Sequence, residues 1–162
     1  MPFGVHRIAG LTYGQGRRDV AFLESDEDSR INVKEVFYAL KEKHQTEMRN
    51  KFDYWKRGGH NDLWFHGFNE IAYRECFVFK RKQAGTYHRF YGFLIHPRPI
   101  TEARYEVCIL VSHGQKNQAS TDPSELNFAN AVRVNPKVVQ AIKVQFPEKP
   151  GAPNASLHFR KR

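Results

Sequence analysis

The residues best suited to chemistry on a phosphate ester lie between positions 74 and 116. Cations that bind phosphates, and aromatic or guanidinium planes that stack on unpaired bases, are the groups that RNA-binding surfaces use. Side chains of these kinds, with imidazoles among them, concentrate in this part of the chain: Arg74, Lys80, Arg81, Lys82, His88, Arg89, Tyr91, His113, Gln115 and Lys116. The pattern predicts an RNA-binding surface.

His113 is the expected proton-transfer residue. It follows the apolar run Cys108–Ser112 and precedes Gly114, so it stands at the end of an expected strand, where functional groups are common. An imidazole there titrates near neutral pH and serves as acid or base, although a histidine that caps a strand or completes a core explains the position at least as well. His66, placed between aromatic residues, has the weaker claim.

Alternation along the segment 87–96 decides which of its side chains share a face. Arg89 and Tyr91 fall on one face of the strand, and His88 and Phe90 fall on the other. If a helix covers the face that bears Phe90, then Arg89 and Tyr91 line an open face on which an anion site can form.

Common cofactor and metal chemistry is not expected. The chain has no phosphate-binding glycine-rich loop with its lysine, no dinucleotide fingerprint, no nucleophile elbow and no histidine-rich metal pattern. Cys76 and Cys108 each lie in an apolar run without another ligand at metal-binding spacing, so both are interpreted as core thiols.

The charge balance favours a polyanionic partner. Lys and Arg number 26 against 17 Asp and Glu, which gives a formal net charge of +9. Such a chain associates with nucleic acid, or with an acidic protein that competes for the same surface. A basic protein without any nucleic-acid role is the alternative.

Length and hydropathy predict one domain in the cytoplasm. The 162 residues suffice for one core, which we place at 1–146, followed by a flexible basic tail at 147–162. No apolar run approaches the roughly 20 residues that cross a bilayer, and the first residues lack the apolar core of a signal peptide. We therefore expect no membrane partner.

The expected elements give an α+β fold, with an antiparallel β-sheet of three to five strands, a long N-terminal helix and short C-terminal helices. The long helix should begin at a capping box formed by Asn32 and Glu35 and end at Gly58-Gly59. A hairpin turn is expected at 83–86 and helix starts at Asp122 and Asn135. The expected strands are an opening strand at 8–13 and a meander of 63–68, 72–81, 87–96 and 104–113.

Short motifs across residues 60–133 resemble the RelE/HigB toxin superfamily, and within it the phage-derived HigB-like group. The most specific is the strand and exit 108–116 followed by the capped helix start at 121–126. The segments 73–77 and 88–93, each with a basic residue, resemble the two preceding strands of that family.

The resemblance implies a toxin of a type II toxin-antitoxin system that cleaves mRNA on the ribosome. It implies attack of the RNA 2′-hydroxyl on the scissile phosphate without a metal or other cofactor. An acidic or amphipathic antitoxin protein would be the second partner. The catalytic set carried over by matching positions is Arg74, Arg89, His113 and Lys116, with Gln115 as a weaker member.

Two other functions stay open. The same superfamily contains toxins directed at DNA gyrase, and a non-catalytic nucleic-acid-binding module would show the same basic surface. Fold resemblance alone does not choose among these activities.

Overall fold

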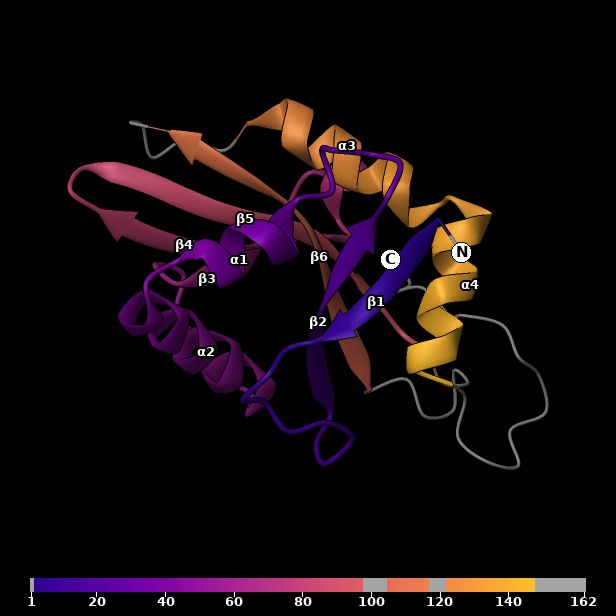
Figure 1. Ribbon diagram of the computed structural model, residues 1–162, viewed down its shortest axis with the longest axis horizontal. Helices are drawn as coiled ribbons and strands as arrows, with labels where there is room; N and C mark the ends of the chain where they lie inside the picture. The colour runs from indigo at the N-terminus through magenta and orange to yellow at the C-terminus, as the bar shows by residue number, and fades with distance from the viewer. Residues whose placement is uncertain (1, 98–104, 117–121, 148–162) are drawn as a thin grey trace.

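The computed structural model describes residues 2–97, 105–116 and 122–147. It is an α+β protein with a six-stranded sheet and four α-helices (Figure 1). In chain order the elements are β1 (Phe3–Arg7), β2 (Arg18–Ser25), α1 (Val33–Ala39), α2 (Glu42–Lys56), β3 (Phe65–Gly67), the 3₁₀ helix η1 (Ile71–Tyr73), β4 (Cys76–Gln83), β5 (Thr86–Ile95), β6 (Glu106–Lys116), α3 (Pro123–Arg133) and α4 (Pro136–Gln145).

The sheet is mixed, with the strand order β1-β2-β6-β5-β4-β3. Strand β2 runs parallel to β6, and the other neighbouring strands are antiparallel. The prediction of an antiparallel sheet with at most five strands was therefore wrong, because it lacked β2. This strand holds the run Val20–Leu23, whose side chains are all fully buried, as is typical of a central strand with a parallel neighbour.

The opening strand expected at 8–13 was also wrong, since strands lie on either side of that segment instead. The predicted meander was largely confirmed as β3, β4, β5 and β6. Its second strand was expected at 72–81, but the start of that segment forms η1 and the strand β4 begins only at Cys76. The predicted basic tail at 147–162 lies, from residue 148 on, outside the described residues, as do residues 98–104. Among the helices of the described ranges, none is long and apolar enough to span a membrane.

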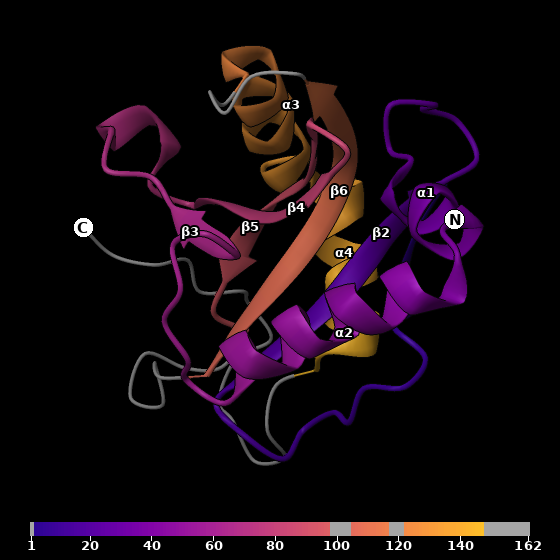
Figure 2. The ribbon, with the colours of Figure 1, turned by 90° about the vertical axis from the view of Figure 1, so that its left-hand side faces the viewer.

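Helices cover both faces of the sheet, with α1 and α2 on one side and α3 and α4 on the other (Figure 2). On the α2 side, Phe22, Phe79 and Phe90 pack against Phe37 and Phe52 of the helices. On the other side, a second core cluster joins the sheet to α4, and Leu126 and Ala129 of α3 pack on β4 and β5. The expected fully open face is therefore absent from the described sheet.

The predicted long N-terminal helix is two helices, because the chain becomes extended at Leu40 (φ −66°, ψ 152°). The side-chain amide of Gln45 donates hydrogen bonds to the carbonyl groups of Tyr38 and Leu40, at 3.2 and 3.0 Å. It thereby satisfies carbonyl groups that the end of α1 leaves free. The break lets both short helices lay apolar residues on the sheet.

The capping box at the start of α1 does not form. The helix begins where predicted, but Asn32 makes no side-chain cap; its Oδ1 accepts a hydrogen bond from the backbone N–H of His113 at 2.9 Å. The other local signals were confirmed. Asp122 and Asn135 cap α3 and α4 with their side chains, and the turn at 84–85 has positive φ at both residues.

Candidate functional site

Basic residues are paired side by side on β4, β5 and β6 next to the hairpin turn. Strand pairing places the backbone positions of these residues in two rows that cross the three strands, with the row Arg81–His88–Gln115 between them. Taken from β4 through β5 to β6, the rows are Lys80–Arg89–Gly114 and Lys82–Tyr87–Lys116. Four of the predicted site residues thus occupy neighbouring register positions.

The side chains of β4 and β5 in these rows lie on the α3 side of the sheet. Val78 and Tyr91 pack against α3, and alternation along each strand puts Lys80, Lys82 and Arg89 on that same side. Further along the strands, toward the turn between β4 and β5, this side of the sheet carries polar groups. We call His66, Lys80, Lys82, Tyr87 and Arg89 the α3-side cluster; His66 belongs to it because it pairs with Val78 on the edge strand β3.

The cluster has a buried cation beneath exposed ones. The Arg89 side chain is only 2% exposed, and its guanidinium carbon lies 5.2 Å from the centre of the Tyr87 ring. The ammonium group of Lys82 lies 5.1 Å from the same ring. Lys82 is exposed and Lys80 half-buried. The arrangement combines surface donors with a desolvated positive charge, which interacts more strongly with an anion than a solvated charge does.

The charges of the cluster influence one another. Burial, and then the positive charge of Arg89, lower the pKa of Lys80, while Asp62 opposes the shift. In the part of the chain that the structure describes, neither Lys80 nor Lys82 forms an ion pair with a carboxylate. An anionic ligand would relieve the repulsion among these cations.

A cavity of about 650 Å³ adjoins the cluster. Lys80, His66 and Arg74 line it, together with Asp62 and Asn69 from the chain on either side of β3. The cavity therefore brings Arg74, which lies outside the two rows, into the same space as Lys80. Its polar lining and size suit part of a nucleotide.

A second cluster occupies the opposite, α2 side of the same strands. The Arg81 side chain is 2% exposed, and its Nε lies 3.1 Å from a carboxylate oxygen of Glu47 on α2. His88 and His113 stack with ring centres 5.2 Å apart, and His88 Nδ1 lies 3.0 Å from His113 Nε2. We call Arg81, His88, His113 and Glu47 the α2-side cluster.

The two imidazoles of the α2-side cluster share one proton between facing nitrogens, so they cannot both be positively charged without losing that hydrogen bond. Burial lowers the pKa of His113 to about 4, with smaller contributions from His88 and Arg81. Burial and then Arg81 also lower the pKa of His88. Both rings are therefore neutral at pH 7, and the only strong positive charge of the cluster is paired.

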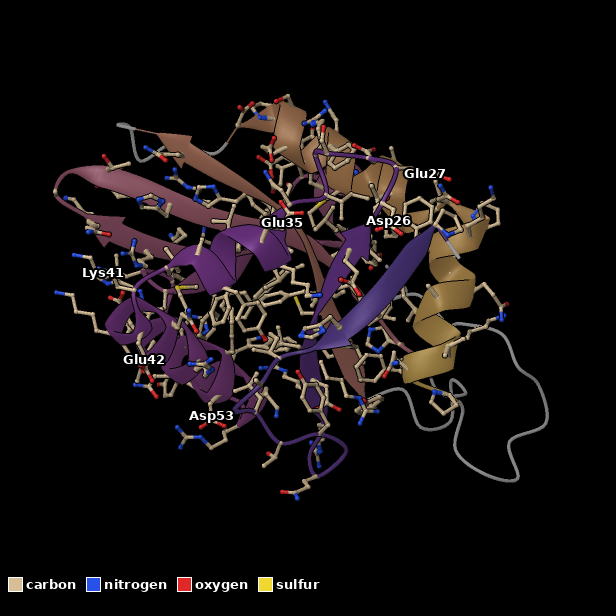
Figure 3. The ribbon with its side chains drawn as sticks, in the orientation of Figure 1. Asp26, Glu27, Glu35, Lys41, Glu42 and Asp53 are labelled. Atoms are coloured by element: carbon tan, nitrogen blue, oxygen red, sulfur yellow. The ribbon has the colours of Figure 1, made fainter. Side chains whose placement is uncertain are left out.

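The outer surface of α1 and α2 carries acidic groups among its cations. Glu35, Glu42 and Asp53 project from the two helices, with Lys41 at their junction (Figure 3). This mixed charge gives phosphate less to bind there than the α3-side cluster does.

The predicted site residues are thus divided between two sides of the sheet. Lys80, Lys82 and Arg89 lie together on the α3 side, Lys116 is paired in their row, and Arg74 shares the cavity. Arg81, His88 and His113 lie on the α2 side. Exposed Gln115 is opposite His88 in the register.

Two expectations about exposure require correction. Tyr91 is 1% exposed because Leu126 and Ala129 of α3 pack over it, so its ring is not available to stack on a base. Arg81, which packs against α2, and Arg89, which was expected on an open face, are both 2% exposed and are not surface cations. Both corrections follow from the helix pair on each face, which the prediction of one open face did not include.

Tyr87 and His66 were not predicted to lie beside Lys80 and Arg89. Tyr87 shares its face with Arg89 by simple alternation, so its position was available from the sequence. His66 could have been assigned to the same side only with the pairing of the short strand β3, since the face of an edge strand depends on its register.

Comparison with known proteins leaves the geometry as the evidence for function: no protein-family model, curated protein or solved structure matches this chain.

Proposed function

We propose that this chain is the toxin of a type II toxin-antitoxin system, a ribosome-dependent endoribonuclease that cleaves mRNA. The observation that carries the proposal is the pairing of β4 with β5, which aligns Lys80 with Arg89 and Lys82 with Tyr87 on one side of the sheet. Cations next to an aromatic ring are the combination that binds the phosphates and bases of an unpaired RNA strand.

The cluster supports cleavage as well as binding. Attack of a 2′-hydroxyl group on the adjacent phosphate places an additional negative charge on the phosphorus oxygens, and no metal ion is needed for this step. Lys80, Lys82 and the buried charge of Arg89 would stabilise that charge more than they stabilise the bound substrate. His113 lies on the opposite side of the sheet from Arg89, so the geometry favours another group for proton transfer.

A partner antitoxin is part of the proposal. An acidic or amphipathic segment that covered the α3-side cluster would neutralise Lys80 and Lys82 and block access of RNA to the cavity. The same charges would favour association of the free protein with the mRNA channel of a ribosome.

Inducible expression in a bacterial host tests this function, with primer extension on abundant messages within minutes of induction. Growth arrest with new cuts inside translated codons is the expected result. Arrest without cuts would point to a gyrase-directed toxin. Normal growth with folded protein present would leave a basic nucleic-acid-binding module and would overturn the proposal.

A further inference from the structure

His66 is the imidazole that faces the α3-side cluster. Its neighbour Phe65 packs against Phe79 in the α2-side core, with ring centres 5.5 Å apart. Alternation turns His66 to the other side, where it pairs with Val78, two positions before Lys80 on β4. His66 and Lys80 line the same cavity.

The ring of His66 is held in one tautomer. Nδ1 lies 2.7 Å from the carbonyl oxygen of Gly67, and because a carbonyl only accepts hydrogen bonds, Nδ1 carries the proton. Nε2 is left with its lone pair, and in the described ranges no hydrogen bond to it is found. Phe68 contacts the ring edge-on, with centres 5.1 Å apart, and limits its rotation.

Burial is the main reason that this imidazole favours its neutral form. Burial lowers the pKa of His66, and the positive charges of Lys80 and Arg89 act in the same direction. The hydrogen bond to Gly67 and the carboxylate of Asp62 oppose the shift. A neutral ring with a free Nε2 beside cations that bind phosphate is the arrangement that a general base for a 2′-hydroxyl group requires.

We propose that His66 is the catalytic base of the site, accepting on Nε2 the proton of the attacking 2′-hydroxyl group; this assignment rests on the function proposed above. The 2′-O–H bond breaks as the bond from the 2′-oxygen to phosphorus forms. The bond from phosphorus to the 5′-oxygen then breaks, and the leaving oxygen takes a proton from the Lys80 ammonium group. The products are a 2′,3′-cyclic phosphate and a 5′-hydroxyl, and exchange with water returns a proton to Lys80 and removes one from His66.

The two groups suit these opposite roles. Burial and Arg89 lower the pKa of Lys80, which makes its ammonium group a better proton donor than an ordinary lysine. His113 does not suit the role of base, because its Nε2 faces His88 at 3.0 Å on the other side of the sheet.

The test is single-turnover cleavage of a 5′-labelled message on programmed bacterial ribosomes, followed from pH 5 to 9 with the purified full chain. His66→Gln is compared with His60→Gln, whose side chain is 84% exposed, so both variants lose one histidine. Binding is measured on a message with a 2′-deoxy nucleotide at the cut position, and urea unfolding checks the fold. His66→Ala with added imidazole provides a second readout.

His66→Gln should cleave about 10²- to 10³-fold more slowly than the wild type, which is the loss expected without a general base. Its binding should change less than about twofold, and the fall in rate at acidic pH should disappear from its profile. Imidazole should partly restore His66→Ala, and His60→Gln should match the wild type.

A His66→Gln variant that cleaves within about threefold of the wild type and keeps the acidic fall in rate would remove the assignment of His66 alone. A wild-type protein that binds ribosomes and cuts nothing would overturn the proposed function, and the assignment with it.

Discussion

The two sides of the β4–β5 hairpin are built from alternating residues of the same strands, yet they differ in charge. On the α2 side, Arg81 meets a carboxylate of Glu47, and the neutral rings of His88 and His113 hydrogen-bond to each other. On the α3 side, cations gather around Tyr87, and Lys80 has a lowered pKa.

The difference shows that a basic residue in a strand acquires a role from the element that faces it. Helix α2 supplies Glu47 to Arg81, which makes that side a structural contact. Helix α3 packs over Val78 and Tyr91, while Lys80 and Lys82 lie further along β4, toward the hairpin turn. Of the two sides of the hairpin, as far as the structure describes them, the α3 side has the cations Lys80 and Lys82 without a carboxylate partner.

The strongest contrast is expected in cleavage. Replacing both lysines of the α3-side cluster, as Lys80→Gln with Lys82→Gln, should slow cleavage on programmed ribosomes by about 10³-fold, because two groups proposed to stabilise the transition-state charge are lost. The matched control is Lys41→Gln with Lys43→Gln, which removes the same charge from exposed positions at the start of α2. Equal losses in the two double variants would show that net charge alone matters.

Substitutions in the α2-side cluster should change the stability of the fold, because Arg81 is paired there with Glu47. Glu47→Ala leaves the buried Arg81 charge without its partner and should lower the free energy of unfolding by about 3 kcal/mol. Arg81→Met removes the buried charge and leaves Glu47, whose side chain is 42% exposed, free to rehydrate, so it should cost less than about 1 kcal/mol. Urea unfolding of both variants measures this asymmetry, and the reverse order would contradict the assigned pairing.

Acid should weaken the α2 side in a predictable window. His113 has a pKa near 4 in the fold against 6.5 as its ordinary value, so the unfolded chain binds a proton that the fold does not. The contribution is complete above pH 6.5 and is lost as pH falls toward 4, by about 1–2 kcal/mol after discounting for partial exposure. His113→Gln should flatten this part of the stability profile, and an unchanged slope would argue against the shift.

The smallest effect concerns salt. Lys82→Gln should reduce by about one the slope of the logarithm of the RNA-binding constant against the logarithm of salt concentration, as expected for the loss of one phosphate contact. Fluorescence anisotropy with a single-stranded RNA measures the slope. Lys43→Gln should leave it unchanged, and a larger change for Lys43 would move the RNA to the α2 side.

Local signals in the sequence predicted much of the fold correctly. The caps Asp122 and Asn135 and the turn at Ala84-Gly85 act within a few residues, so they depend little on the rest of the chain. The break at Leu40 and the parallel pairing of β2 with β6 depend on tertiary packing, which no short segment encodes.

In the candidate site too, some features follow from local sequence and others from tertiary packing. From the sequence alone, alternation along the strand put Arg89 and His88 on opposite faces of the sheet, and the structure agrees. The burial of Tyr91 depends on α3, and the position of His66 depends on the register of β3 with β4. The grouping of His66 with Lys80 therefore became visible only when the strands were paired.

The most direct test of the account maps where RNA touches the protein. A message that carries 4-thiouridine next to a 2′-deoxy nucleotide at the proposed cut site is bound with this protein on ribosomes and irradiated, and the crosslinked residues are identified by mass spectrometry. Crosslinks to the α3-side cluster, chiefly to Tyr87 and Lys82, are the expected result. Crosslinks to α1, α2 or the surface around His88 and His113, with none on the α3 side, would contradict it.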